Sequence, residues 1–167
     1  MKRVIAVSDS HGYVNDLRDA IELAEKVGQI DVLVFLGDGY ADIEVVWNEL
    51  KARSPQTAIY IVRGNNDWRY QSPNHVAFKV DGVTFYACHG HEWQVKYSLH
   101  RLCYAAKEKD ARVALYGHTH RSHLEMDYGL YLMNPGAICE RGIGKSAYAE
   151  IYVSDEGQIN ADLVFWK

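Results

Sequence analysis

The chain has 167 residues, of which 48% are hydrophobic and 24% are charged, and its formal net charge is −4. This balance excludes wholesale disorder and fits a single domain over residues 1–167 with a real core. The acidic total and the lack of a dense Lys/Arg run argue against a stable complex with nucleic acid, although a short nucleic-acid end could still be a substrate.

The cysteines and the apolar runs indicate in which cellular compartment the protein is expected. The three cysteines are widely spaced and form no CxxC pair, so neither a disulfide scaffold nor a zinc–thiolate cluster is supported. The first apolar run is very short and meets Asp9 and His11 at once, unlike a signal peptide. No later stretch approaches the ~20 apolar residues of a membrane span. We therefore expect a cytoplasmic protein without a membrane anchor.

The first half of the chain alternates strands and helices. Apolar runs at 4–7, 32–36 and 57–62 predict buried strands. Apolar residues spaced three and four apart predict one helix over 15–27 and a second after Asp42. This strand–helix–strand–helix–strand order predicts a parallel sheet with right-handed crossovers.

The second half is rich in strands. Residues 75–80 and 83–88 are joined by Asp81-Gly82, a strong hairpin signal. A third helix is predicted over 97–107. Further strands are predicted at 113–116, 122–126, 130–133, 147–153 and 159–165. The whole pattern predicts an α/β fold in which two packed sheets are flanked by helices.

Five polar clusters each follow an apolar strand. They are Asp9-Ser10-His11, Gly37-Asp38, Gly64-Asn65-Asn66-Asp67, His89-Gly90-His91 and Gly117-His118-Thr119-His120. Ligand sites of open α/β sheets form where loops leave the carboxyl ends of strands. We therefore expect these side chains to meet along one edge of the fold, at the carboxyl ends of the strands, which we call the rim. Any one of them could merely cap a turn, but their joint occurrence is hard to explain in that way. Carboxylates, imidazoles and an amide oxygen suit a pair of divalent cations, with manganese expected first and nickel, zinc or iron as alternatives.

The order DxH, GD, GNxD, HGH, GHTH resembles the calcineurin-like metallophosphoesterase superfamily. The short chain, the GNND in place of the commoner GNH[DE], and Asn134-Pro135-Gly136 resemble its small YfcE-like branch, which includes the retromer subunit Vps29. Each motif alone is weak, but the five in order are highly specific, and the whole match runs from Asp9 to Gly136. The resemblance implies a four-layer α/β/β/α sandwich of two mixed sheets with flanking helices.

The resemblance also implies a role for each rim residue. Asp38 would bridge two metals, with Asp9, His11 and His120 on the first and Asn65, His89 and His118 on the second. A hydroxide shared by the two cations would then attack phosphorus in line, with Asn66 and His91 touching the phosphate. The expected activity is a metal-dependent phosphodiesterase that acts on a small phosphoester. Because imidazoles must be neutral to bind metal, activity is expected to be lost below about pH 6.

Asn66 departs from the superfamily pattern. Many members carry a histidine there that acts as a general acid, whereas asparagine cannot supply a proton. Either the leaving group is intrinsically good, or His91 or a water protonates it, so we expect activated diesters to be preferred over alkyl monoesters.

Two other functions compete with a phosphodiesterase. One is a non-catalytic metal-binding scaffold like Vps29, which departs from the catalytic pattern at the bridging aspartate and the GN asparagine. Asp38 and Asn65 are both present here, which favours an enzyme. The other is a nuclease of the same superfamily, which usually carries DNA-binding parts that this chain has neither the length nor the basic surface to supply.

Some residues near the motifs have no firm assignment. Tyr40, Trp68, Arg69 and Trp93 could stack an aryl group at the rim, although roofing the core is favoured for both tryptophans. Asp67 is expected only to fix its turn through backbone hydrogen bonds.

The cysteines and the C-terminal tail are also open to interpretation. Cys88 is predicted to point into the core, and Cys139 is undetermined. The apolar tail Phe165-Trp166 either completes the core or forms a subunit contact, so a homo-oligomer stays open.

Overall fold

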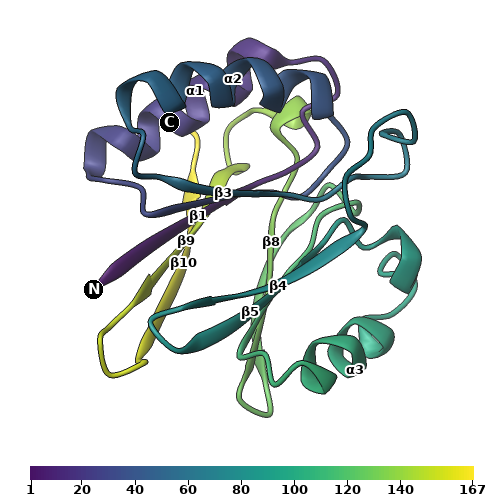
Figure 1. Cartoon of the computed structure of the whole chain (residues 1–167). Helices are drawn as coiled ribbons and strands as arrows, with labels where there is room; N and C mark the ends of the chain where they lie inside the picture. The colour runs from purple at the N-terminus through teal and green to yellow at the C-terminus, as the bar shows by residue number, and fades with distance from the viewer.

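The computed structural model describes residues 1–167 and places two sheets face to face between helices (Figure 1). The first sheet contains, in spatial order, β10 (Ile159–Phe165), β9 (Ser146–Val153), β1 (Lys2–Val7), β2 (Val32–Phe35) and β3 (Ala58–Ile61). The second contains β4 (His75–Val80), β5 (Val83–Cys88), β6 (Val113–Leu115), β8 (Leu130–Pro135) and β7 (Ser122–Asp127). Both sheets mix parallel and antiparallel pairs, so the expected α/β/β/α sandwich is confirmed.

Helices cover the outer face of each sheet (Figure 1). The helices α1 (Val14–Val27) and α2 (Tyr40–Arg53) lie on the first sheet, and α3 (His100–Glu108) lies on the second. None of them is both long and apolar enough to cross a membrane.

Three apolar clusters join the layers. Side chains alternate along β1, so Val4 and Ala6 enter the core between the sheets while Ile5 and Val7 pack under α1 and α2. Both faces of β1 are therefore buried, which is why its sequence reads as a continuous apolar run. The third cluster places Leu102 of α3 against the outer face of the second sheet.

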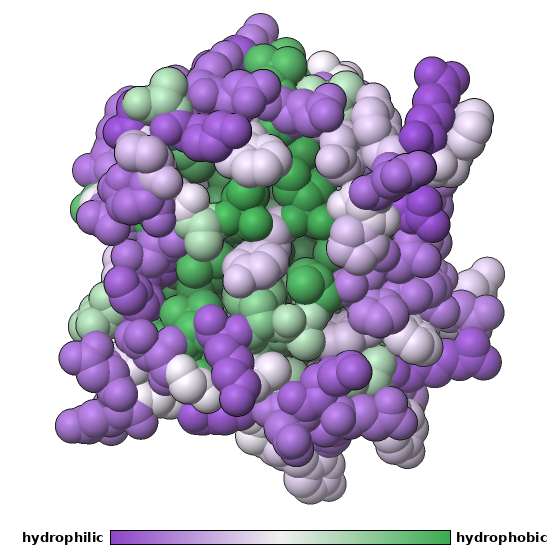
Figure 2. Space-filling view, viewed as in Figure 1, coloured by the Kyte–Doolittle hydropathy of each residue, from purple (hydrophilic) through white to green (hydrophobic).

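Figure 2 shows apolar side chains between the two sheets, framed by polar surface, on the side where β3 and β4 form the sheet edges. Here the ring of Tyr60 stacks on that of Phe78 with centroids 4.0 Å apart. The inter-sheet core thus reaches the surface at this edge.

The parallel strands bring their carboxyl ends to a common edge. Val7 pairs with Phe35, which pairs with Ile61, so β1, β2 and β3 end in step. In the second sheet β5 and β6 are likewise parallel, with Ala87 opposite Leu115. The five polar clusters follow these five strands, as the sequence predicts.

The starts of two helices differ by more than one residue from the sequence prediction. The helix α2 begins at Tyr40 rather than after Asp42, because the buried Asp42 carboxylate accepts hydrogen bonds from Ser10 Oγ (2.6 Å) and Gly12 N (2.8 Å) inside the fold. The helix α3 begins at His100 rather than at residue 97, because a short 3-10 helix, η1 (His91–Trp93), and the turns after it occupy the preceding chain.

Aromatic residues divide between the core and the surface. Trp93 packs against the third cluster and donates a hydrogen bond to the Tyr86 hydroxyl (3.0 Å), as favoured from the sequence. The same expectation is wrong for Trp68, which is 71% exposed. Trp166 is buried and completes the core under α1, whereas Phe165 is half exposed. Cys88 is buried on the α3 side of the second sheet, as predicted.

Candidate metal centre

Five polar residues in the turns of the rim have positive φ angles, a backbone conformation that residues other than glycine rarely adopt. The φ angles are 56° at Asp9, 43° at His11, 59° at Asp38, 68° at His118 and 61° at His120. Each such conformation costs of order 1–3 kcal/mol and persists only where the surrounding fold imposes it. Such concentration of strain on one rim is typical of a functional site.

Glycines allow the loops after β2 and β3 to touch. A Cβ atom on Gly37 would lie 2.5 Å from Gly64 N and 2.9 Å from His89 Nδ1. A Cβ atom on Gly64 would overlap the Asp38 carboxylate. Any side chain at either position would therefore push the rim loops apart.

Asp67 clamps the same two loops together. One carboxylate oxygen accepts from Asp38 N (2.7 Å) and Gly64 N (2.8 Å), and the other accepts from Gly39 N and Tyr40 N (both 3.1 Å). The prediction that Asp67 fixes the turn through backbone hydrogen bonds is thus confirmed. The clamp also reaches the loop after β2, which sets the position of Asp38.

A first group of ligand atoms surrounds Asp9, which is fully buried. Its Oδ2 accepts from His118 N (3.1 Å) and from the Ser8 hydroxyl. Its Oδ1 is buried without a hydrogen-bond partner and lies 3.2 Å from His120 Nε2 and 3.5 Å from His11 Nε2. An orphaned buried carboxylate oxygen that faces two imidazole nitrogens fits a cation seated between them.

A second group of ligand atoms meets at His89. Its Nδ1 donates to the Leu36 carbonyl (2.7 Å), which turns Nε2 towards the rim and leaves its lone pair available whenever the ring is neutral. That Nε2 lies 3.1 Å from Asn65 Oδ1, 3.2 Å from Asp38 Oδ2 and 3.2 Å from His118 Nδ1. Because carboxylate, amide and imidazole lone pairs converge there, this donor set fits a second cation.

Asp38 belongs to both groups. Its Oδ2 lies 3.2 Å from His89 Nε2 and 3.7 Å from His11 Nε2. The structure therefore brings together all seven side chains that the sequence analysis singled out, with Asp38 in the middle. Their roles as individual metal ligands stay predictions.

Asn66 and His91 lie beside the second group. Asn66 holds Asp38, because its backbone N–H donates to Asp38 Oδ1 and its side-chain amide donates to Asp38 Oδ2, both at 2.9 Å. The His91 ring is half-buried, with its centroid 5.5 Å from that of His89. Their expected contact with a phosphate stays a prediction.

The electrostatics of the two groups differ. The Asp9 carboxylate, 3.2 Å from His120 Nε2, raises the pKa of His120 to about 9 with help from Glu140 and against the opposing effect of burial. Burial pushes the Asp9 pKa up, but the imidazoles of His11 and His120 beside Oδ1 outweigh it and hold that pKa well below its usual range. Burial and then the charge of His89 lower the pKa of His118 to about 4. His118 is thus neutral at pH 7, whereas His120 carries a proton in the metal-free protein.

Two residues of the site have no role in the sequence analysis. Both lie on the short 3-10 helix η2 (Ile138–Glu140), which packs against the end of β1. Glu140 Oε1 lies 3.0 Å from His120 Nδ1, so it orients that ring as carboxylates do behind metal-bound imidazoles. Cys139 places its Sγ within 4.8 Å of ring nitrogens of His11 and His120. Asn134-Pro135-Gly136, which belongs to the family pattern, precedes η2 and is the one sequence signal for it.

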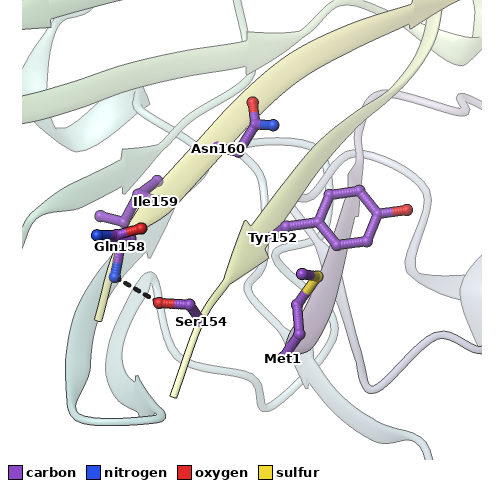
Figure 3. Close-up of a pocket in the computed structure, with 6 residues that line it drawn as sticks. All are labelled: Met1, Tyr152, Ser154, Gln158, Ile159 and Asn160. Atoms are coloured by element: carbon purple, nitrogen blue, oxygen red, sulfur yellow. Dashed lines mark hydrogen bonds between the residues drawn. The ribbon is translucent and has the colours of Figure 1, made fainter. Parts of the chain in front are cut away.

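Two hollows of similar size have very different linings. One, of about 360 Å³, adjoins the rim and is lined by Lys96, His118, Thr119, His120, Arg121, Glu140 and Lys145. The other, of about 310 Å³, lies between Met1 and the β9–β10 hairpin (Figure 3). The second hollow is at the amino end of β1, opposite the rim, and has no imidazole or carboxylate in its lining. Only the first hollow is connected with the metal centre.

The comparisons with known proteins agree on one family. The profile of the calcineurin-like phosphoesterase superfamily domain matches residues 1–156. The probable metallophosphoesterase YsnB of Bacillus subtilis (strain 168) is 29% identical over 136 residues, which are 81% of this chain and 74% of that protein. A probable metallophosphoesterase of Mycoplasma pneumoniae is 30% identical over 141 residues, which are 83% of this chain and 80% of that protein.

Solved structures share the fold over nearly the whole chain. An archaeal phosphodiesterase superposes with a TM-score of 0.69 at 21% identity and covers 97% of this chain and 99% of its own. Vps29 of Chaetomium thermophilum superposes with a TM-score of 0.71 at 16% identity and covers 97% of this chain and 94% of its own. At these identities the likeness establishes the fold alone.

The Asp67 clamp generates a first prediction. Asp67→Asn replaces one acceptor oxygen by an NH₂ group that faces two backbone N–H donors, so we expect a loss of about 3 kcal/mol in the free energy of unfolding. Urea unfolding measures this loss. Asp162→Asn, which changes an exposed carboxylate on β10, is the matched control. Equal stability of the two variants would contradict the clamp.

The raised pKa of His120 generates a second prediction. A cation displaces the proton that His120 holds below about pH 9, so apparent metal affinity should rise about tenfold per pH unit for each proton displaced, up to that pH. The effect on the metal-free protein has the opposite sign: stability from His120 is present below its ordinary pKa of 6.5 and is lost as pH rises through about 9.

Manganese titration calorimetry in two buffers of different ionisation enthalpy counts the released protons. We expect at least one proton released at pH 7. Manganese binding that releases no proton, with an affinity that does not change between pH 6 and 9, would contradict the proposed site.

Proposed function

Because the chain belongs to the calcineurin-like phosphoesterase superfamily, we propose that it is a metal-dependent phosphodiesterase that acts on small phosphoesters. Its proposed cofactors are two divalent cations, and manganese is the first candidate. The observation that carries the proposal is the position of Asp38 Oδ2, which lies within 3.7 Å of one imidazole nitrogen from each ligand group, that of His11 and that of His89.

The chain's own residues divide the work. Two cations seated in the site would lower the pKa of a water between them and neutralise charge on the phosphate oxygens. Asp38 spans the two positions, and the Asp67 clamp and Asn66 fix its carboxylate. His89 is locked in one tautomer by the Leu36 carbonyl, and His120 is oriented by Glu140. The site is thus assembled before substrate arrives, which is the condition for effective electrostatic catalysis.

Charge around the rim supports an anionic ester as the substrate. Lys96, Arg121 and Lys145 line the hollow beside His118 and His120, in a chain whose net charge is −4. A local excess of cations in an acidic protein attracts anions to that place.

An adjoining hollow of about 530 Å³ suits the organic part of such an ester. It shares Lys96, Thr119 and Arg121 with the first hollow and adds an apolar wall. That wall consists of Val95, Leu99 and Tyr116. We therefore place the leaving alcohol of the ester on this wall.

A non-catalytic scaffold is the weaker alternative. Asp38 and Asn65, the two residues at which Vps29 departs from the catalytic pattern, are both present and lie within the second group. The chain shares its fold with Vps29 at only 16% identity, which carries no functional argument.

Hydrolysis of bis(p-nitrophenyl) phosphate with added manganese tests the proposal. Asp38→Asn removes the negative charge that lies between the two cation positions. Loss of a residue that only hydrogen-bonds to a metal ligand typically lowers activity ~10–100-fold, so the kcat of Asp38→Asn should fall by more than that. Asp162→Asn should retain wild-type activity. Absence of hydrolysis with every divalent metal tried would favour the scaffold.

The leaving group provides a separate prediction. Asn66 cannot donate a proton, so turnover should fall steeply from aryl diesters to alkyl monoesters. In Asn66→His the new imidazole can act as a general acid, and the ratio of alkyl to aryl turnover should rise about tenfold or more. Parallel kcat measurements on the two ester types give this ratio. Faster turnover of alkyl monoesters than of aryl diesters by the wild type would contradict this account.

A further inference from the structure

Cys139 is the one cysteine that lies at the candidate metal centre. Its Sγ and one ring nitrogen each from His11 and His120 all lie within 4.8 Å of one another. The other two cysteines, Cys88 and Cys103, pack in the cluster under α3 on the second sheet. All three thiols are free, so no disulfide occupies Cys139.

The fold fixes the place of this thiol. Cys139 N donates to the Asp9 carbonyl (3.1 Å), and Ile138 N donates to the Ser8 carbonyl (3.0 Å), so η2 is tied to the end of β1. The Ile138 side chain is anchored in the core under α1. The sulfur is thus held against the rim by backbone bonds on one side and apolar packing on the other.

Asp9 independently indicates a cation at this place. Its Oδ1 is fully buried, has no hydrogen-bond partner and faces the same two imidazoles that Cys139 approaches. A buried carboxylate oxygen without a donor requires positive charge nearby. The thiol is therefore not a lone feature, because it lies close to a buried carboxylate oxygen that requires positive charge.

We propose that Cys139 is an additional sulfur ligand of the first cation, beside Asp9, His11 and His120. On binding, the thiol gives up its proton to water and its sulfur forms a bond to the cation. Thiolate ligands favour zinc and cobalt over manganese and magnesium, so this residue biases the first position towards thiophilic ions. The inference rests on the proposed two-cation site and deepens it by assigning the two positions different metal preferences.

Cobalt spectroscopy tests this ligand directly. Cobalt(II) bound through a thiolate shows a near-ultraviolet charge-transfer band, while its weaker visible bands report any bound cobalt. We expect the charge-transfer band in the wild type and in Cys103→Ser, and its loss in Cys139→Ser with the visible bands retained.

The outcomes separate this proposal from the proposed function. Visible cobalt bands without a Cys139-dependent charge-transfer band would overturn the sulfur ligand and leave the metal centre intact. Failure of the wild type to bind cobalt, zinc or manganese would overturn the metal centre itself, and the sulfur ligand with it.

A measurement on the wild-type protein removes dependence on the serine variant. Zinc should slow alkylation of Cys139 by iodoacetamide, followed by peptide mass spectrometry, and leave alkylation of the half-buried Cys103 unchanged. Competition titrations should show the preference for zinc over manganese reduced about tenfold or more in Cys139→Ser. Equal alkylation of Cys139 with and without zinc would contradict the proposal.

Discussion

Buried negative charge at the rim is the constraint on which the rest of the structure depends. Asp9 and Asp38 are almost completely withdrawn from water, and their carboxylates face imidazole nitrogens. Such groups are stable inside a protein only when positive charge is close. In the metal-free protein a proton on His120 supplies part of that charge, which is why the pKa of this residue is raised. Divalent cations supply this positive charge more completely. The buried carboxylates therefore account both for the shape of the rim and for its affinity for metal.

The remainder of the fold keeps these repelling groups together. Both faces of β1 are buried, so the strand that presents Asp9 cannot shift without disturbing two cores. The Gly37–Gly64 contact and the Asp67 clamp hold the loops after β2 and β3 at the closest approach that their backbones allow. The free energy stored in five strained rim residues is balanced by this packing. A rim held in this way needs little rearrangement when it binds a phosphate.

Residues whose roles follow from local pattern could be predicted from the sequence. Apolar runs located the strands, and because parallel strands end in step, the polar clusters behind them had to meet. Asp67 was predictable because its type and place in a tight turn fix its hydrogen bonds. Cys139 and Glu140 were not, since a single 3-10 turn has no periodicity and only the packing of Ile138 brings it to the site. Trp68 was misplaced because apolar character alone does not say whether a loop residue finds a core to enter.

Crystals soaked in manganese and measured at its absorption edge would test the central claim most directly. The account predicts two anomalous peaks about 3.5–4 Å apart, one on each side of the Asp38 carboxylate. The first should lie among Asp9, His11 and His120, and the second among Asn65, His89 and His118. No peak at the rim, or peaks only at places away from Asp38, would contradict it.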